Sequence, residues 1–216
     1  PPQASDARVL GGLEVVDLAG VRYALINSTT SLAYLSGATW TGVAFLAAAS
    51  SGSQQLPPGG SVSDYWDWTQ IYSDRADQIM AVGVKNLRYV PYAWVAGATT
   101  FSALTGAPGA RCVAAFDNYL VLGNLDSDRP QRVQWSDRGS ASSWTGGLSG
   151  FEDLLQAKGE IRRIVPLENR CIVFFDDETW YGTSGEFPSV LRFTPLDTTV
   201  GCPYPRTVVS TPQGVL

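Results

Sequence analysis

One unit recurs along this chain and limits the folds open to it: an apolar strand, a tight polar turn, a second apolar strand, and a Gly/Ser-rich stretch closed by an aromatic residue. The four complete copies, given as strand, turn, strand and closing aromatic, are 13–16, 17–20, 21–26 with Trp40; 79–82, 83–86, 87–90 with Phe101; 112–116, 117–118, 119–122 with Trp135 and Trp144; and 161–167, 168–170, 171–175 with Trp180 and Phe193. A fifth copy begins with a strand at 207–210 and a turn at 212–214. Hairpins that repeat in this way are typical of radial β architectures.

Further strands are expected between these hairpins, at 31–35, 39–45, 64–72, 132–136, 179–182 and 190–193. The only helical signal is at 151–158, which is long enough for one or two turns. We therefore predict an all-β fold, built as an irregular β-propeller-like array of antiparallel hairpins or blades.

Composition divides the chain into three parts. Residues 1–46 hold the first β-hairpin unit or blade, residues 47–63 form a Pro/Gly/Ser-rich loop, and residues 64–216 hold further blades, of which the last is incomplete. The sequence lacks an initiator Met and ends within the fifth repeat, and a strand without its neighbours leaves unpaired backbone groups. We therefore expect the chain to be a fragment of a larger protein.

Composition also excludes several function classes. Charged residues make up 16% and hydrophobic residues 44% of the 216 residues, which suits a compact, turn-rich β protein. The net charge of −5 comes with no basic run, so tight nucleic-acid binding is not expected, although an acidic wall is compatible with DNA sliding past it.

No apolar run is long enough to span a membrane, and no signal peptide is evident. Three cysteines without a C-x-x-C motif indicate buried thiols and folding in a cytoplasmic compartment.

The chain contains no histidine, which excludes Ser-His-Asp and Cys-His catalysis and the common histidine-bearing metal sites within it. A carboxylate pair could still hydrolyse a glycoside, and the candidates are Asp64 with Asp67, or the run 176–178. The second set is interpreted as ordinary turn chemistry. The alternating oxygen ligands of 124–128 lack the Gly and terminal Glu of a calcium loop. We predict no enzyme activity, no catalytic, cofactor-binding or metal-ligating residue, and no cofactor.

Two aromatic patterns allow a sugar-binding interpretation. Trp66 and Trp68 share one side of the expected strand 64–72, where they could stack a sugar or form a hydrophobic layer between sheets, and the layer is favoured. The segment 135–139 with Trp144 has the ingredients of a sialidase Asp box, but its spacing fails. The sequon at 27–29 has no secretion signal to support it.

Several segments together resemble the tail hub and nozzle proteins of tailed, mainly short-tailed, bacteriophages, also called tail tubular or DNA-stabilisation proteins. They are Val133-Gln134-Trp135-Ser136-Asp137, Ser143-Trp144, 164–175, Thr179-Trp180-Tyr181-Gly182, 109–123 with its Asp-Asn turn, and 197–205 with Gly201-Cys202. The likeness runs from about Gln78 onward.

The resemblance implies a β-propeller virion protein that forms a ring of about six copies in the tail. Such a ring would contact portal and adaptor proteins and tail fibres or spikes, line the path along which genomic DNA leaves, and assemble in the bacterial cytoplasm. Two alternatives stay open: a propeller glycosidase or carbohydrate-binding module, in which Asp64, Asp67, Trp66 and Trp68 would converge in one pocket, and a β-sandwich adhesion or fibre domain.

Overall fold

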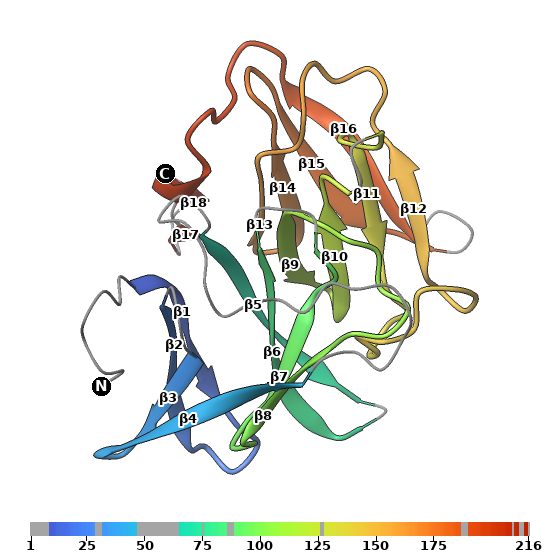
Figure 1. Ribbon diagram of the computed structural model, residues 1–216. Coiled ribbons are helices and arrows are strands. Elements are labelled where there is room, and N and C mark those ends of the chain that lie inside the picture. The colour runs from blue at the N-terminus through green and yellow to red at the C-terminus, as the bar shows by residue number, and fades with distance from the viewer. Residues whose placement is uncertain are drawn as a thin grey trace.

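The computed structural model describes residues 9–28, 32–46, 65–74, 76–85, 89–125, 128–186, 190–208, 210–211 and 214–215. Within these residues the regular structure is strand, together with one 3-10 turn, η1, at Pro205–Thr207. The all-β prediction is confirmed (Figure 1). The described part holds no helix long and apolar enough to cross a membrane.

The strands form four consecutive antiparallel blades of four strands each, followed by a short hairpin. Blade 1 is β1 (Val9–Val16), β2 (Arg22–Ser28), β3 (Leu32–Ser36) and β4 (Thr39–Leu46); blade 2 is β5 (Trp66–Ser73), β6 (Gln78–Lys85), β7 (Tyr92–Val95) and β8 (Thr100–Ala103); blade 3 is β9 (Cys112–Phe116), β10 (Tyr119–Gly123), β11 (Arg132–Trp135) and β12 (Gly150–Asp153); blade 4 is β13 (Arg163–Leu167), β14 (Arg170–Phe174), β15 (Thr179–Ser184) and β16 (Leu191–Asp197); and the hairpin is β17 (Ser210–Thr211) with β18 (Gly214–Val215).

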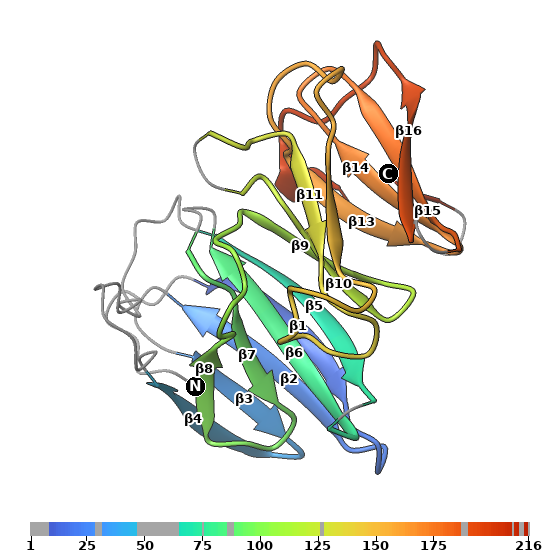
Figure 2. The same ribbon diagram turned by 90° about the vertical axis from the view of Figure 1, so that its right-hand side faces the viewer.

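The blades are arranged so that their first strands follow one another. β1 contacts β5, β5 contacts β9, β9 contacts β13, and β13 contacts β17. Figure 2 shows blades 2, 3 and 4 stacked face to face in this order. This succession of inner strands supports a radial array rather than two facing sheets of a β-sandwich.

At the outer rim, blades 1 and 2 are joined directly. Residues 44–46 of β4 pair in parallel with residues 100–102 of β8, which fuses the two blades into one eight-stranded sheet. Blades 3 and 4 remain separate four-stranded sheets, since neither β12 nor β16 has a second strand partner among the described residues.

Each interface between blades has its own hydrophobic core. Aromatic rings fill the core between blades 1 and 2, where Tyr34 and Trp94 lie 5.1 Å apart and Trp66 packs near Phe101. The core between blades 2 and 3 is mainly aliphatic, with Trp144 as its one aromatic ring in the described part of the chain. The core between blades 3 and 4 again contains several aromatic rings. We call blades 1 and 2 one half of the array and blades 3 and 4 the other; the buried aliphatic core between the halves is the least aromatic of the three.

The third hairpin lies where the sequence places it. β9 and β10 are joined by Asp117 and Asn118, whose φ angles of 47° and 62° are those of a type I′ turn. The first and fourth hairpins also match, with β1–β2 and β13–β14 paired across short turns.

The second hairpin was predicted wrongly. Residues 83–86 were expected to turn, but β6 continues through Gly83 to Lys85 and pairs with β5, and the described turn residues between those strands are 74, 76 and 77. Gly83 serves close packing instead, because a Cβ there would lie 2.6 Å from Cζ3 of Trp68. Residue 86 of the expected turn and residues 87–88 of the expected second strand lie outside the described residues.

Two smaller expectations also need correction. The segment 151–158 begins with β12 rather than a helical turn, since Arg132 and Asp153 bond across β11 and β12 at 2.6 Å. The fifth hairpin is present but starts later than predicted, because Pro205 opens the short helix η1 first. The loop 47–63 lies outside the described residues.

Candidate functional site

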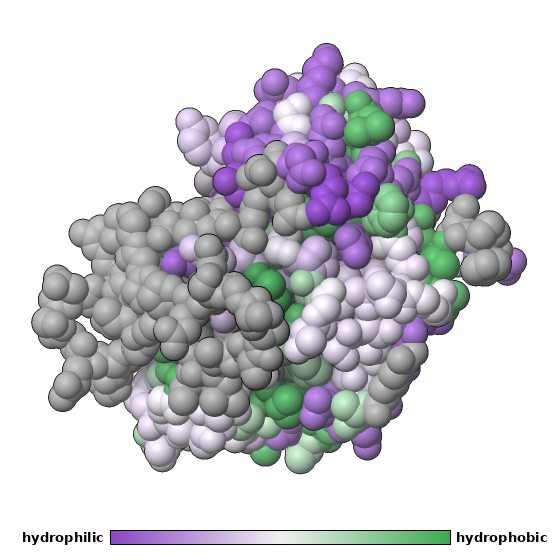
Figure 3. Space-filling model, turned by 45° about the vertical axis from the view of Figure 1, so that its right-hand side comes forward, coloured by the Kyte–Doolittle hydropathy of each residue, from purple (hydrophilic) through white to green (hydrophobic). Residues whose placement is uncertain are grey.

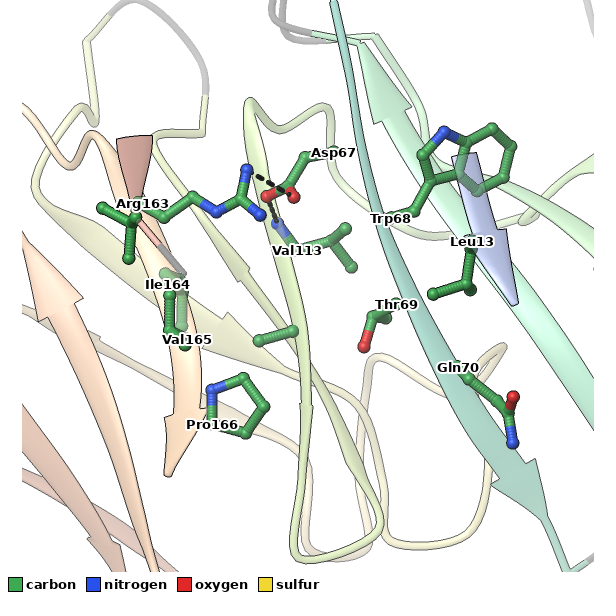
Figure 4. Close-up of a pocket in the computed structure, with 12 residues that line it drawn as sticks. Leu13, Asp67, Trp68, Thr69, Gln70, Val113, Arg163, Ile164, Val165 and Pro166 are labelled. Atoms are coloured by element: carbon green, nitrogen blue, oxygen red, sulfur yellow. Dashed lines mark hydrogen bonds and ion pairs between the residues drawn. The ribbon is translucent and has the colours of Figure 1, made fainter. Parts of the chain in front are cut away.

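The inner strands border a partly open cavity of about 200 Å³, which is the candidate site of this molecule. It is lined by side chains of β1, β5, β9 and β13 and by Val208, which precedes β17. Figure 4 shows Asp67 and Thr69 of β5 on the side that faces Arg163 of β13, and Gln70 on the opposite side of β5. We call this space the axial cavity.

Asp67 is the central polar residue of the axial cavity. Its side chain is only 3% exposed. Oδ1 lies 3.0 Å from Nη1 of Arg163 on β13, and Oδ2 accepts a hydrogen bond from the backbone N–H of Val113 on β9 at 3.1 Å. One carboxylate on β5 therefore reaches the inner strands of both following blades (Figure 4).

Burial changes the acidity of this carboxyl. Loss of hydration raises the pKa of Asp67 to about 6, against the opposing effects of Arg163 and of backbone N–H groups. The ion pair offsets burial only in part, since Arg163 offers one nitrogen to the carboxylate and its Nε is buried without a hydrogen-bond partner.

Two further side chains of β5 occupy unpaired edges of neighbouring inner strands. Thr69 accepts a hydrogen bond from the N–H of Ala115 at 2.9 Å, and Gln70 accepts one from the N–H of Val16 at 3.3 Å. These N–H groups have no strand partner at the axis among the described strands, so without such acceptors they would carry a desolvation cost. The polar groups of β5 thus bind the blades to one another.

A second polar network joins blades 3 and 4 just before β13. Glu160 accepts hydrogen bonds from Arg111 and Asn124 and pairs with Arg162 at 2.7 Å, and Arg162 in turn pairs with Asp176 at 2.8 Å. The charges compensate one another within the network. It ties the start of blade 4 to blade 3.

The carboxylates proposed from the sequence are not brought together in one site. Asp64 lies outside the described residues. Asp67 lies in the axial cavity, Asp176 pairs with Arg162, and Glu178 accepts the indole N–H of Trp180 in the core of blade 4. In the described part of the chain, no group of three or more Cys, Asp or Glu is placed to hold a metal ion.

Trp66 and Trp68 form part of a hydrophobic layer. Their rings stack 5.3 Å apart, and the indole N–H of Trp68 donates to Oδ1 of Asn27 at 3.0 Å. Both rings pack in the core between blades 1 and 2, and Figure 4 shows Trp68 on the side of β5 away from Asp67. The expectation of an inter-sheet layer is confirmed, and Asn27, the sequon residue, is buried in it.

The segment with Asp-box ingredients is an ordered loop. Oδ1 of Asp137 accepts hydrogen bonds from the N–H groups of Arg138 and Leu148, and Ser136 accepts one from the N–H of Leu120. Trp144 is buried between blades 2 and 3. These residues hold the 136–149 connection in place.

Two of the three thiols are buried, as expected. Burial raises the pKa of Cys171 to about 12 and raises that of Cys112 further, so neither is ionised at neutral pH. Cys202 is partly exposed, and none of the three forms a disulfide.

On the face shown in Figure 3, hydrophilic residues gather over the upper part of the molecule, and hydrophobic residues form small separate patches. The exposed large apolar side chains include Leu155, Leu196 and Tyr204, which are 78%, 52% and 74% exposed. Leu155 borders a second hollow, of about 360 Å³, between β12 and β16. Single exposed apolar side chains of this kind are ordinary on a protein surface.

Comparison with protein-family models and with curated proteins finds no match to this chain. Sequence reasoning identified Asp67 as a candidate carboxylate but missed its partner Arg163 and the roles of Thr69 and Gln70. The available signal was the presence of Asp67, Thr69 and Gln70 in a strand that also contains Trp66, Trp68 and Tyr72.

Proposed function

We propose that this chain is a structural, non-catalytic component of a bacteriophage tail, part of a hub or nozzle ring between the portal and adaptor and the distal tail. The observation that carries the structural part is the use of the axial polar groups. Asp67, Thr69 and Gln70 all accept hydrogen bonds from neighbouring inner strands, so the polar centre of the array serves cohesion between blades.

The phage assignment is supported by the resemblance of segments 133–137, 164–175 and 179–182 to tail hub proteins. In the structure these segments form β11, β13, β14 and β15, the framework of blades 3 and 4. The acidic net charge of −5 also suits a surface past which DNA moves without binding.

The axial cavity is not wide enough to be the DNA path in this proposal. A volume of about 200 Å³ holds only a handful of water molecules, at roughly 30 Å³ each. A DNA channel would instead lie between copies of the protein, arranged in a ring with cyclic symmetry.

Two measurements test the proposal. Native mass spectrometry and negative-stain imaging of the full protein should give a closed ring with a central pore. Antibody-gold labelling of phage particles from cells that carry the gene should mark the tail next to the capsid. A protein that stays monomeric at micromolar concentration and is absent from particles would overturn it.

The glycosidase alternative has its own test. A sugar-binding role requires glycan arrays or thermal-shift screens to reveal a ligand, and that binding to fall when Asp67 or Trp68 is replaced. A sugar-dependent shift that is lost in these variants would replace the structural proposal with this one.

A further inference from the structure

The joint between the two halves of the array contains one buried carboxylate, in addition to the aliphatic core and the hydrogen bond from Ala115 to Thr69. Blades 1 and 2 are fused through β4 and β8 and share an aromatic core, and blades 3 and 4 share another. Between the halves, Asp67 bonds the N–H of Val113 on β9 and the guanidinium of Arg163 on β13. We propose that Asp67 is a proton-sensitive joint, whose protonation state sets how firmly blades 3 and 4 are held against blades 1 and 2.

The surroundings of Asp67 make the strength of the joint depend on whether its carboxyl is ionised. The carboxylate is 3% exposed, its nearest contact with Arg163 is 3.0 Å long, and Nε of Arg163 is buried without a hydrogen-bond partner, so the lost hydration is incompletely replaced. Any separation of β5 from β9 and β13 would return the carboxylate to water. An ionised carboxylate gains more from that return than a neutral one, so ionisation favours opening.

Two other ionisable groups near Asp67, Cys112 and Tyr65, have pKa values that burial raises above their ordinary alkaline ones. On β9, Cys112 is buried and stays a neutral thiol, and just before β5, Tyr65 has a pKa raised by burial. Arg163 on β13 is the charge in contact, and Arg111 beyond it is already paired with Glu160. Leu13 and Val208 line the β1 and β17 sides of the cavity with apolar atoms.

The direction of the effect follows from the two protonation equilibria. The carboxyl binds its proton with a pKa of about 6 in the closed array, and with a value near the ordinary 3.8 once it is hydrated. The opening constant therefore rises with pH between these values. From pH 4.5 to pH 7.5 we expect an increase on the order of twentyfold, after which the curve is flat.

Amide hydrogen exchange measures this opening. The exchange rate of Val113, divided by its intrinsic rate at each pH, should increase by that factor between pH 4.5 and pH 7.5 in the wild-type chain. The Asp67→Asn variant keeps an oxygen acceptor for the Val113 N–H and cannot ionise, so the same ratio should stay constant. Amides of the β14–β15 ladder, within blade 4, should show no comparable pH dependence.

Thr69→Val is the matched control. It removes the neighbouring acceptor, that of Ala115, without changing any charge, so it should raise exchange in β9 equally at both pH values. A direct carbon NMR titration of the Asp67 carboxyl in the wild-type chain covers the case in which Asp67→Asn fails to fold. Titration near pH 6 supports the joint. Titration near pH 4, or a pH dependence of Val113 that persists in Asp67→Asn, overturns it.

Discussion

Replacing Gly83 by Ala should destabilise the protein, although alanine is normally the better strand residue. Gly83 lies within β6, and a Cβ at this position would sit 2.6 to 2.9 Å from three carbons of the Trp68 ring. The ring cannot easily retreat, because it stacks on Trp66 at 5.3 Å and donates its N–H to Asn27 at 3.0 Å. Overpacking of this kind costs about 1–3 kcal/mol, and removal of a glycine returns about 0.5–1 kcal/mol. The expected net loss is about 0–2.5 kcal/mol, centred near 1 kcal/mol.

Gly42→Ala supplies the comparison. Gly42 lies in β4 and a Cβ there would meet no atom within 4 Å, so this variant should be neutral or stabilised by about 0.4–1 kcal/mol. Urea unfolding followed by tryptophan fluorescence gives both free energies. Near-ultraviolet circular dichroism reports whether the stack of Trp66 and Trp68 is disturbed. If Gly83→Ala proves as stable as Gly42→Ala, the close packing of Trp68 over β6 is refuted.

Three further outcomes are expected. Thiol titration of the native chain should detect Cys202 and leave Cys112 and Cys171 unreactive until denaturant is added, because burial keeps those two protonated; rapid reaction of all three would contradict the buried positions. Asp137→Ala should lower the free energy of unfolding by about 1–3 kcal/mol in a urea titration, since two backbone N–H groups lose their acceptor, and an unchanged midpoint would argue against the ordered loop. Glu168→Gly should raise stability by about 1 kcal/mol in the same assay, because Glu168 has a φ of 50°, and a loss would contradict the left-handed turn.

Local sequence signals predicted the parts of the fold that depend on neighbouring residues. Asp117 and Asn118 both tolerate positive φ, so the pair marks the β9–β10 turn without any knowledge of tertiary structure. The alternation of 64–72 likewise placed Trp66 and Trp68 on one face. In each case the turn or face is a property of residues that are adjacent in the chain.

The errors arose where a residue's role depends on a distant contact. Gly83 has the appearance of a turn residue, and only the position of the Trp68 ring explains why a strand needs glycine there. The parallel pairing of β4 with β8 joins residues more than fifty positions apart and has no local signature. Arg163 belongs to the expected fourth hairpin, but nothing near it in sequence indicates a bond to Asp67.

The same long-range contacts satisfy backbone groups that a radial arrangement of blades leaves without a strand partner. An inner strand has a partner on one side only, so its axial edge carries backbone N–H groups that no neighbouring strand accepts. Here β5 supplies the acceptors, through Gln70 for β1 and through Asp67 and Thr69 for β9. A hydroxyl or an amide does this without charge, whereas the carboxylate adds a buried charge that needs Arg163 and is only partly compensated by it. An asparagine side chain would accept the same N–H but would leave Arg163 without its counter-ion, so the stability difference between the wild-type chain and the Asp67→Asn variant at neutral pH measures the ion pair together with the cost of leaving Arg163 unpaired.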